Sequence, residues 1–313
     1  MTIEEKGNYT PVVSVIVPNY NHSQYLDERI CSILNQTYQN FELIILDDNS
    51  TDNSREIIEK YRGNPHVSRI EYNETNSGLT FKQWEKGINL SKGKLIWIAE
   101  SDDSCYPEML EELVREFDNN EKCVLAYCKS NFYHDGQPCK TTNNSKKAVS
   151  MSGKTFIKLF LSCGNSVYNA SSALFKKEVA IKINKDYFDY KGAGDRLFWV
   201  YISEFGDVSI VRKRLNIFRL HNNNSTSRYF YYGINQIEDK KILDYLCQKG
   251  YVGRFMQLVS RIRYCNSQVV GRAFATEDIR DNVEKCWSLT KPERMLIKVY
   301  RVTYKFLKII GLL

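Results

Sequence analysis

Two β-branched runs with a one-sided helix between them constrain the fold of this chain more than any other feature. The first run, Val12–Val17, stops at Pro18, and the second, Phe41–Leu46, stops at two aspartates. Uninterrupted apolar runs of this length are typical of strands that are covered on both faces. Between them, apolar side chains recur every three to four residues, at Leu26, Ile30, Ile33, Leu34 and Tyr38. Together the three segments predict a βαβ unit.

The alternation of strands and helices continues along the chain. We expect helices at 52–61 and 80–90 and from Pro107 onward, and strands at 67–72, 95–99 and 124–132. This order predicts an α/β fold with an open, mainly parallel, Rossmann-like sheet and helices on both faces. The polar run 140–149 is expected to be a mobile loop. Beyond residue 226 the strand signals fade, so we expect an α/β domain at 1–226 and a helical C-terminal region at 227–313.

The charge distribution argues against a nucleic acid partner. The net charge is +7, but five basic residues and no acidic one fall in 294–313, which leaves +2 for the rest. A duplex binder normally carries a basic footprint on the domain that touches phosphate. No stretch approaches the roughly 20 apolar residues of a membrane span, and the first residues lack a basic-then-apolar signal. We therefore expect a cytoplasmic protein, and the nine cysteines, without a C-x-x-C pair, predict neither a disulfide framework nor a zinc site.

Polar side chains follow each expected strand at the point where it ends. These segments are Pro18–Asn21, Asp47–Ser50, Asn76–Gly78 and Glu100–Asp103. In open α/β sheets, ligands bind outside the carboxyl ends of the strands. The sequence has no G-x-G-x-x-G after the first strand and no G-x-x-x-x-G-K-[ST], so a Rossmann dehydrogenase and a P-loop enzyme are disfavoured. Strand-end carboxylates can instead hold Mg²⁺ or Mn²⁺, which complete their shell with phosphate oxygens and water.

Five motifs in order resemble the family 2 glycosyltransferases of GT-A fold, in their bacterial, non-processive form. They are VSVIVPNYN at 13–21, DDNSTD at 47–52, NSG at 76–78, WIAESDD at 97–103 and GDRLFW at 194–199. The resemblance spans about residues 11–226. The Q-x-x-R-W sequence of the processive members is absent.

The resemblance implies roles for particular residues. It implies a nucleotide pocket, with UDP as the expected nucleotide, built from Pro18, Tyr20, Asp48, Lys82, Ser101 and Asp102. It implies a metal bound by Asp102 and Asp103, because Glu100 replaces the first aspartate of the family's D-x-D motif. Weaker candidates for contact with the diphosphate or the acceptor are Arg219, His221, Glu100 and Trp199. Tyr20 as a core aromatic and His221 as a structural histidine stay open as alternatives.

Asp195 resembles the catalytic base of the family. The implied reaction is an inverting transfer from a nucleotide sugar to a hydroxyl of a saccharide or lipid-linked saccharide, in the synthesis of a cell-surface polysaccharide. Because Asp195 opens an apparent helix, it is also suited to cap that helix. A nucleotidyltransferase and a non-catalytic carbohydrate-binding protein remain as alternatives. No motif identifies the sugar or the acceptor.

The C-terminal tail predicts an amphipathic helix. Arg294, Lys298, Arg301, Lys305 and Lys308 fall on one stripe, and Met295, Val299, Val302, Phe306, Ile309 and Leu313 form an apolar stripe beside it. Such a helix can lie on an anionic membrane surface as a peripheral contact. Alternatively, its apolar stripe docks on the catalytic domain or on a second subunit of an oligomer.

Overall fold

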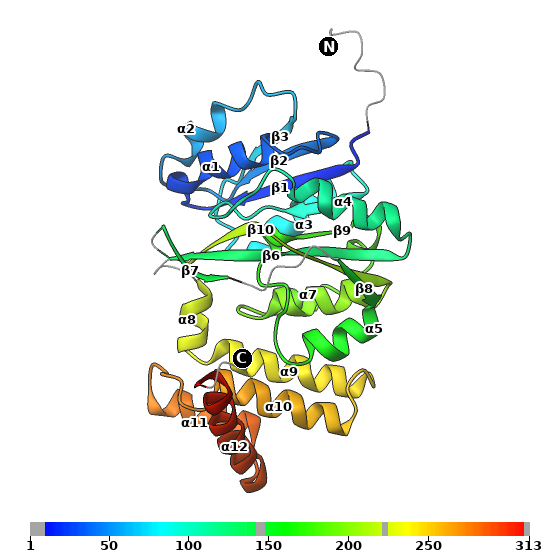
Figure 1. The fold of residues 1–313 in the computed structure, drawn as a ribbon. Helices are drawn as coiled ribbons and strands as arrows, with labels where there is room; N and C mark the ends of the chain where they lie inside the picture. Colours follow the sequence, from blue (N-terminus) through cyan, green and yellow to red (C-terminus); the bar gives the residue numbers. More distant parts are fainter. Residues whose placement is uncertain (1–9, 135, 142–147, 221–224, 310–313) are drawn as a thin grey trace. The chain divides into compact units, whose positions relative to one another are not determined.

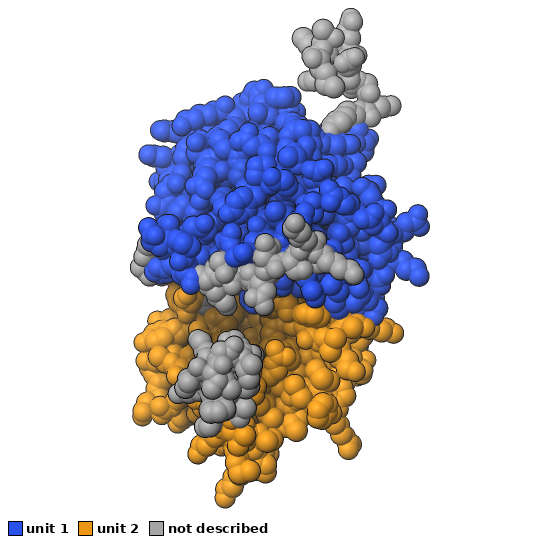
Figure 2. Space-filling view, in the orientation of Figure 1, with its two compact units in different colours: residues 1–153, 167–188, 201–221 blue, residues 154–166, 189–200, 222–313 orange. Residues whose placement is uncertain are grey.

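The computed structural model describes residues 10–134, 136–141, 148–220 and 225–309, and in 140–141, 225–226 and 302–309 only the backbone. Within these ranges the chain forms two compact units, coloured separately in Figure 2. Unit 1 comprises residues 1–153, 167–188 and 201–221, and unit 2 comprises 154–166, 189–200 and 222–313. Two segments before residue 222 belong to unit 2, and the second of them, 189–200, contains Asp195. Of the expected loop at 140–149, residues 142–147 lie outside the described ranges.

All the strands in the described part of the chain, labelled in Figure 1 where there is room, belong to unit 1. The strands are β1 (Val13–Asn19), β2 (Phe41–Asp47), β3 (Val67–Tyr72), β4 (Leu95–Ile98), β5 (Ser104–Cys105), β6 (Cys123–His134), β7 (Gln137–Thr141), β8 (Val149–Ser152), β9 (Ala173–Lys176) and β10 (Asp207–Leu220). Its helices are α1 (Ser23–Leu34), α2 (Ser54–Glu59), α3 (Thr80–Leu90), α4 (Met109–Asn119) and α6 (Lys177–Ala180), with a 3-10 turn η3 (Ala170–Ser172). The ends of the expected loop at 140–149 belong to β7 and β8.

The strands form one mixed sheet in the order β3-β2-β1-β4-β9-β6-β10-β5, with β7 beside β6 and β8 beside β10. The first four strands are parallel, as the sequence predicts. β9 is antiparallel to both β4 and β6, and β10 is parallel to β6. The carboxyl ends of β1, β2, β3, β4, β6 and β10 therefore lie at the same edge. The strand order reverses at β1, which is where an open α/β sheet binds its ligand.

The core of unit 1 follows the alternation of side chains along β1. Val13, Val15 and Val17 face one side and pack with α1 and α4 in a fully buried cluster. Ile16 faces the other side, against α3. A Cβ at Gly87 of α3 would lie 2.4 Å from Cγ2 of Ile16, so the helix can approach the strand this closely only with glycine there. This packing fixes the strand ends that carry the polar loops.

Unit 2 is helical in the described part of the chain. Its elements are α5 (Gly153–Phe156, from its second residue), the π-helical turn η2 (Ile157–Leu161), α7 (Gly194–Ser203, up to Val200), α8 (Ser225–Tyr231), α9 (Ile234–Gln248), α10 (Arg254–Gln268), α11 (Glu277–Trp287) and α12 (Lys291–Ile309). The 3-10 turn η4 (Asp186–Asp189) crosses from unit 1 into unit 2. No helix in the described ranges is long and apolar enough to cross a membrane.

The C-terminal helix α12 packs through Ile297, which belongs to neither predicted stripe, and through Arg301 of the basic stripe. Ile297 is buried, and the Arg301 guanidinium donates to Oδ1 and O of Asn266 on α10 at 2.6 and 2.9 Å. The apolar stripe stays exposed where it is described, with Met295 64% and Val299 54% accessible. Within unit 2, therefore, Met295 and Val299 are covered only in part, and docking of the stripe on the catalytic domain or on a second subunit stays an open alternative. The remainder of the stripe lies outside the described side chains.

Candidate active site

The loops after β1 and β2 each contain an asparagine in the left-handed backbone conformation, which asparagine tolerates better than most residues, and Asn21 ties the two loops together. Asn21 has φ 55° and Asn49 has φ 63°. Oδ1 of Asn21 accepts a hydrogen bond from the Thr51 amide at 2.7 Å, and its own amide donates to Oγ of Ser50 at 2.9 Å. This crosslink presents Tyr20, which is 46% exposed, at the sheet edge. Tyr20 is thus not a core aromatic.

Asp48 is the centre of a dense set of hydrogen bonds. Its buried carboxylate accepts from Nδ2 of Asn73 at 2.6 Å, from the amide and hydroxyl of Ser77 at 2.9 and 2.7 Å, and from Nε2 of Gln83 at 2.9 Å. Asn73 and Ser77 belong to the segment that follows β3, and Gln83 belongs to α3. Nζ of Lys82 donates to the Ser77 carbonyl at 3.1 Å. Asp48 therefore holds the pocket loops together.

The loop after β4 places Glu100 and Ser101 in different surroundings. Oε1 of Glu100 accepts from the indole of Trp84 at 2.9 Å, while Oγ of Ser101 lies 2.8 Å from Nδ1 of His22. Removal from water, and next the charge of Asp102, raise the pKa of Glu100 to about 8. Glu100 thus has its own partner inside unit 1, and no motif pointed to the contact between Ser101 and His22.

Asp103 anchors the same loop to distant parts of unit 1. Its carboxylate, 1% exposed, accepts from Nδ2 of Asn169 at 2.5 Å and from the backbone amide of Arg219 at 3.1 Å. Oδ1 of Asn169 accepts in turn from Nδ2 of Asn216 at 3.1 Å. Burial and the charge of Asp102 raise the pKa of Asp103 to about 7. Asp102 is half-buried, and its backbone carbonyl accepts a hydrogen bond from the Arg219 guanidinium.

Arg219 lies at the carboxyl end of β10 and reaches the same loop. Its guanidinium donates to the Asp102 carbonyl at 3.0 Å, pairs with Glu28 of α1, and lies 5.3 Å from the ring centre of Tyr25. The backbone and side chain of Arg219 thus both contact the Asp102–Asp103 pair. His221 lies outside the described residues.

Arg29 supplies a buried positive charge that acts on Glu100 and Asp103. It is fully buried in α1, its guanidinium stacks 5.0 Å from the ring centre of Trp97, and none of its three nitrogens has a hydrogen-bond partner among the described residues. Its charge acts to lower the pKa of both Glu100 and Asp103, against the larger effect of burial. A buried guanidinium of this kind offsets the negative charge collected at the edge.

The donor set at this edge fits a hard divalent cation. In the described ranges, no three His, Cys, Asp or Glu side chains group to hold a metal by themselves. Asp102 and Asp103 offer carboxylate oxygens, and the Asp103 carboxylate also accepts hydrogen bonds from Asn169, Ser171 and the Arg219 amide. Mg²⁺ and Mn²⁺ need few protein carboxylates when diphosphate oxygens and water supply the other ligands.

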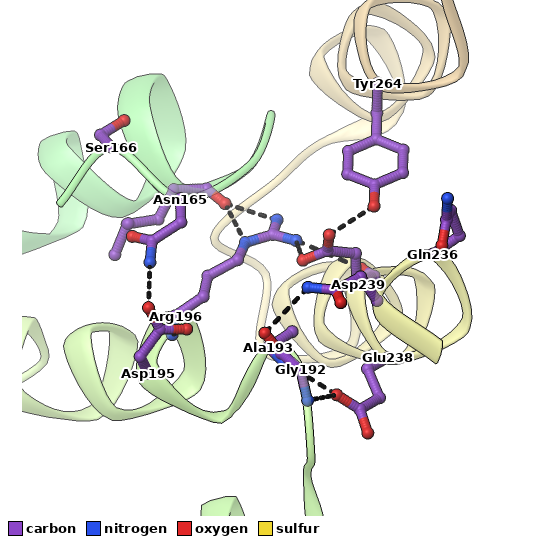
Figure 3. Close-up of polar contacts among 12 residues, drawn as sticks. Asn165, Ser166, Gly192, Ala193, Asp195, Arg196, Gln236, Glu238, Asp239 and Tyr264 are labelled. Atoms are coloured by element: carbon purple, nitrogen blue, oxygen red, sulfur yellow. Dashed lines mark hydrogen bonds and ion pairs between the residues drawn. The ribbon is translucent and has the colours of Figure 1, made fainter. Parts of the chain in front are cut away.

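Asp195 lies in unit 2, in the first turn of α7 (Figure 3). Its half-buried carboxylate accepts from Nδ2 of Asn165 at 2.7 Å and from the backbone amide of Arg196 at 2.7 Å. Removal from water raises the pKa of Asp195 to about 7, and the charge of Asp239 adds to this, while hydrogen bonds and Arg196 oppose it. A carboxylate with a pKa near neutrality is suited to accept a proton at physiological pH.

Trp199 follows Asp195 by one turn but is fully buried. Its ring packs edge-on against Phe198 at 4.9 Å, so the side chain holds α7 and has no exposed surface for a substrate. The weak expectation that Trp199 contacts the acceptor is therefore not supported by its position. Asn165, which does contact the carboxylate of Asp195, carries no motif that sequence reasoning could have used.

Comparison with known proteins defines the class of this chain. Residues 14–183 match the model of glycosyl transferase family 2. This match covers more than half of the chain, so the protein belongs to that family. The GT-A resemblance inferred from the five motifs is confirmed.

The chain is similar to glycosyltransferase GlyG of Streptococcus pneumoniae, with 37% identity over 123 residues, which are 39% of this chain and 40% of GlyG. It thus spans less than half the length of that relative. In structure it is similar to Staphylococcus aureus TarS 1–349 in complex with UDP-GlcNAc, with a TM-score of 0.68, 18% identity, and coverage of 88% of this chain and 80% of the other. The mannosyltransferase PcManGT from Pyrobaculum calidifontis, in complex with GDP-Man and Mn²⁺, gives a TM-score of 0.56 at 14% identity, covering 93% and 84%. At these identities the likeness shows the fold.

Proposed function

We propose that this glycosyltransferase moves a sugar from a nucleoside-diphosphate sugar, with UDP as the nucleotide, to a hydroxyl of a saccharide or lipid-linked saccharide. The product is part of a cell-surface polysaccharide. The observation that carries the proposal is the convergence of four strand-end loops around Asp48 and the Asp102–Asp103 pair at one sheet edge. The UDP-GlcNAc complex of TarS supports UDP, since the two chains share this fold.

In this proposal the nucleotide lies at the edge formed by Pro18, Tyr20 and the loop that Asp48 anchors. The exposed Tyr20 ring is available to stack on the base. Because protein donors already fill the carboxylate of Asp48, we propose that it shapes the pocket and takes a base N–H only by exchanging one of them. Lys82 and Ser101 complete the proposed nucleotide-binding set.

Asp102 and Asp103 would hold Mn²⁺ or Mg²⁺. When bound, the cation offsets the negative charge that develops on the leaving diphosphate. The two carboxylates fix that position because Arg219 and Asn169 hold their loop. The relative with Mn²⁺ supports this cofactor.

Asp195 is the proposed catalytic base. Its carboxylate takes the proton of the acceptor hydroxyl, the hydroxyl oxygen bonds to the anomeric carbon, and the carbon–oxygen bond to the diphosphate breaks with its electron pair on the leaving group. Attack opposite the leaving group inverts the configuration. Asn165 orients the carboxylate by its hydrogen bond to Oδ2.

A nucleoside-diphosphate release assay with a panel of donors and Mn²⁺ tests this function. We expect release with one or more UDP-sugars in the presence of a saccharide acceptor, loss of release in excess EDTA, and strong reduction in Asp102→Asn. Full activity in EDTA would contradict the metal role. Glu74→Gln, an exposed acid near the end of β3, is the matched control and should keep full activity.

We further propose that α12 makes a peripheral contact with an anionic membrane surface. Met295, Leu296, Val299 and Tyr300 are exposed on one side of the helix. Arg294 and Lys298, which are also exposed, supply positive charge beside them. A helix with exposed apolar and basic side chains matches the boundary between anionic head groups and acyl chains.

A further inference from the structure

Helix α9 carries two adjacent acids that the proposed reaction does not use. Glu238 is 8% exposed and Asp239 is 6% exposed. Buried carboxylates are rare unless they are paired, and each of these has an elaborate set of partners. All the partners described below belong to unit 2, and Figure 3 shows Glu238, Asp239 and Tyr264 beside the segment from Gly192 to Arg196.

Glu238 holds the loop that leads into α7. Its carboxylate accepts hydrogen bonds from three consecutive backbone amides, those of Lys191, Gly192 and Ala193, each at 2.8 Å. Nδ2 of Asn235, one turn earlier on α9, donates to the Gly192 carbonyl at 2.8 Å. A Cβ at Gly192 would lie 2.4 Å from Oδ1 of Asn235, so this close approach requires glycine. The loop that ends two residues before Asp195 is thus fixed to α9.

Asp239 holds the residue that directly follows the proposed base. Oδ1 of Asp239 pairs with Nη1 of Arg196 at 2.5 Å, and the hydroxyl of Tyr264 on α10 donates to the other oxygen. Nε and Nη2 of Arg196 both donate to the Leu161 carbonyl, at 2.9 and 2.5 Å. The Arg196 side chain is 2% exposed. The Arg196 guanidinium is therefore held by Asp239 on one side and by the Leu161 carbonyl on the other.

We propose that Glu238 and Asp239 are positioning residues that set the place of the Asp195 carboxylate, Glu238 through the preceding loop and Asp239 through Arg196. This inference rests on the proposed role of Asp195 as the base. The two acids hold the backbone on either side of Asp195, and Asn165 then orients the carboxylate itself. A misplacement of a catalytic group by about 1 Å can cost about 100-fold in rate, so contacts that hold both sides of a base matter for catalysis. We call the contacts made by Glu238 and Asp239 the unit 2 clamp. The C-terminal helices would then belong to the catalytic apparatus.

The clamp also acts on the base through charge. The charged groups that affect Asp195 are Asp239 on α9, which raises its pKa, and Arg196 on α7, which lowers it. Tyr264 on α10 acts on Asp239 by its hydrogen bond, and Glu238 is turned toward the amides of the loop. In Asp239→Asn the negative charge is lost while Arg196 stays, so the pKa of Asp195 falls. The acid limb of the pH profile of kcat then moves to lower pH.

The test compares Glu238→Gln and Asp239→Asn with Asp244→Asn in the full chain. Asp244 lies on the same helix and pairs with Lys240, but its side chain is 44% exposed. We expect kcat to fall about 10- to 100-fold in the first two variants, with the donor KM and the dissociation constant of UDP unchanged. Asp244→Asn should stay within about twofold of the original protein. A purely structural role for Asp239 would lower the folded fraction but would leave kcat per folded molecule unchanged.

Other outcomes separate this inference from the proposed function. If Asp195→Asn keeps full transfer activity, Asp195 is not the base and the proposed mechanism fails. If Asp195→Asn is inactive while Glu238→Gln and Asp239→Asn keep full kcat, the positioning role is overturned. Should those two variants not fold, Tyr264→Phe decides, because it removes one hydroxyl from Asp239. A folded Tyr264→Phe with a severalfold lower kcat supports the clamp, and one with unchanged kcat contradicts it.

Discussion

Asp48 in unit 1 and Asp195 in unit 2 are both proposed to serve one reaction, but the protein holds them in different ways. Asp48 follows a buried strand, and its carboxylate accepts hydrogen bonds from loops that end at the same sheet edge. Asp195 opens a helix whose flanking residues are fixed by α9. The first arrangement follows from sheet topology, while the second depends on contacts between residues more than 40 positions apart. Substitutions of the two aspartates should therefore impair different properties of the enzyme.

The largest expected effect is on catalysis at Asp195. Asp195→Asn removes the proton acceptor, so transfer should fall roughly 10²- to 10⁴-fold, the usual contribution of a general base. The dissociation constant of UDP, measured by calorimetric titration, should change little. Loss of UDP affinity in this variant would mean that Asp195 serves the donor site or the fold.

Substitution of Asp48 should instead lower the stability of the fold and the affinity for UDP. Asp48→Ala leaves the donors of Asn73, Ser77 and Gln83 without their shared acceptor in a buried place. We expect the free energy of unfolding to fall by roughly 3 kcal/mol and UDP affinity to fall with it. Denaturant unfolding and calorimetry measure the two. Asp118→Ala, at an exposed acid on α4, is the control and should change neither. Unchanged unfolding in Asp48→Ala would show that the loops do not depend on this hub.

The difference between the two sites also explains how much the sequence could predict. The β-branched runs and the one-sided helices predicted the parallel strands, and the strand ends then predicted which residues lie at the edge, because topology brings them together. β9, antiparallel in the middle of the sheet, has only four residues and no alternation to mark it. Asn169 and Asn216, which fix Asp103, are polar residues without a motif, and only the folded chain brings them to it.

The unit 2 clamp was beyond sequence reasoning for a similar reason. Glu238 and Asp239 look like ordinary acids of a surface helix, since their neighbours in the chain include Lys240 and Lys241. Their burial depends on packing with α7 and α10. The boundary expected at 226/227 stays a prediction, and Asp195 lies in the unit that contains the C-terminal helices.

The pH dependence of transfer sharpens the comparison. The pKa of Asp195 is raised to about 7 by its removal from water. A base acts only when it is deprotonated, so kcat should rise with pH, reach half of its plateau near pH 7, and fall about tenfold for each pH unit well below that. Rates measured at saturating donor and acceptor between pH 5 and pH 9 test this. A flat profile over that range would contradict a base with this pKa.

Arg29 offers a smaller effect at the donor edge. Its buried guanidinium lacks a hydrogen-bond partner among the described residues, so replacement by an apolar side chain of similar length should cost little stability. We expect Arg29→Met to change the free energy of unfolding by less than about 1 kcal/mol. Activity should nevertheless fall severalfold, because Glu100 and Asp103 lose a compensating charge. A strongly destabilised Arg29→Met would instead assign Arg29 to the fold.

The smallest expected effect concerns α12, since the proposed membrane contact changes where the enzyme works and not its chemistry. The full chain should sediment with phosphatidylglycerol vesicles at low salt and be released at high salt, because its basic residues meet anionic head groups. Replacing Met295 and Val299 together by glutamine removes two exposed apolar side chains and should weaken binding roughly tenfold, since each inserts only in part. Phe255→Gln, at a 76% exposed residue of α10, is the control and should bind as the original protein does. Transfer to a soluble acceptor should be equal in all three. Equal sedimentation of the double variant, or a dimer that the double substitution dissociates, would show that these side chains meet a second subunit instead.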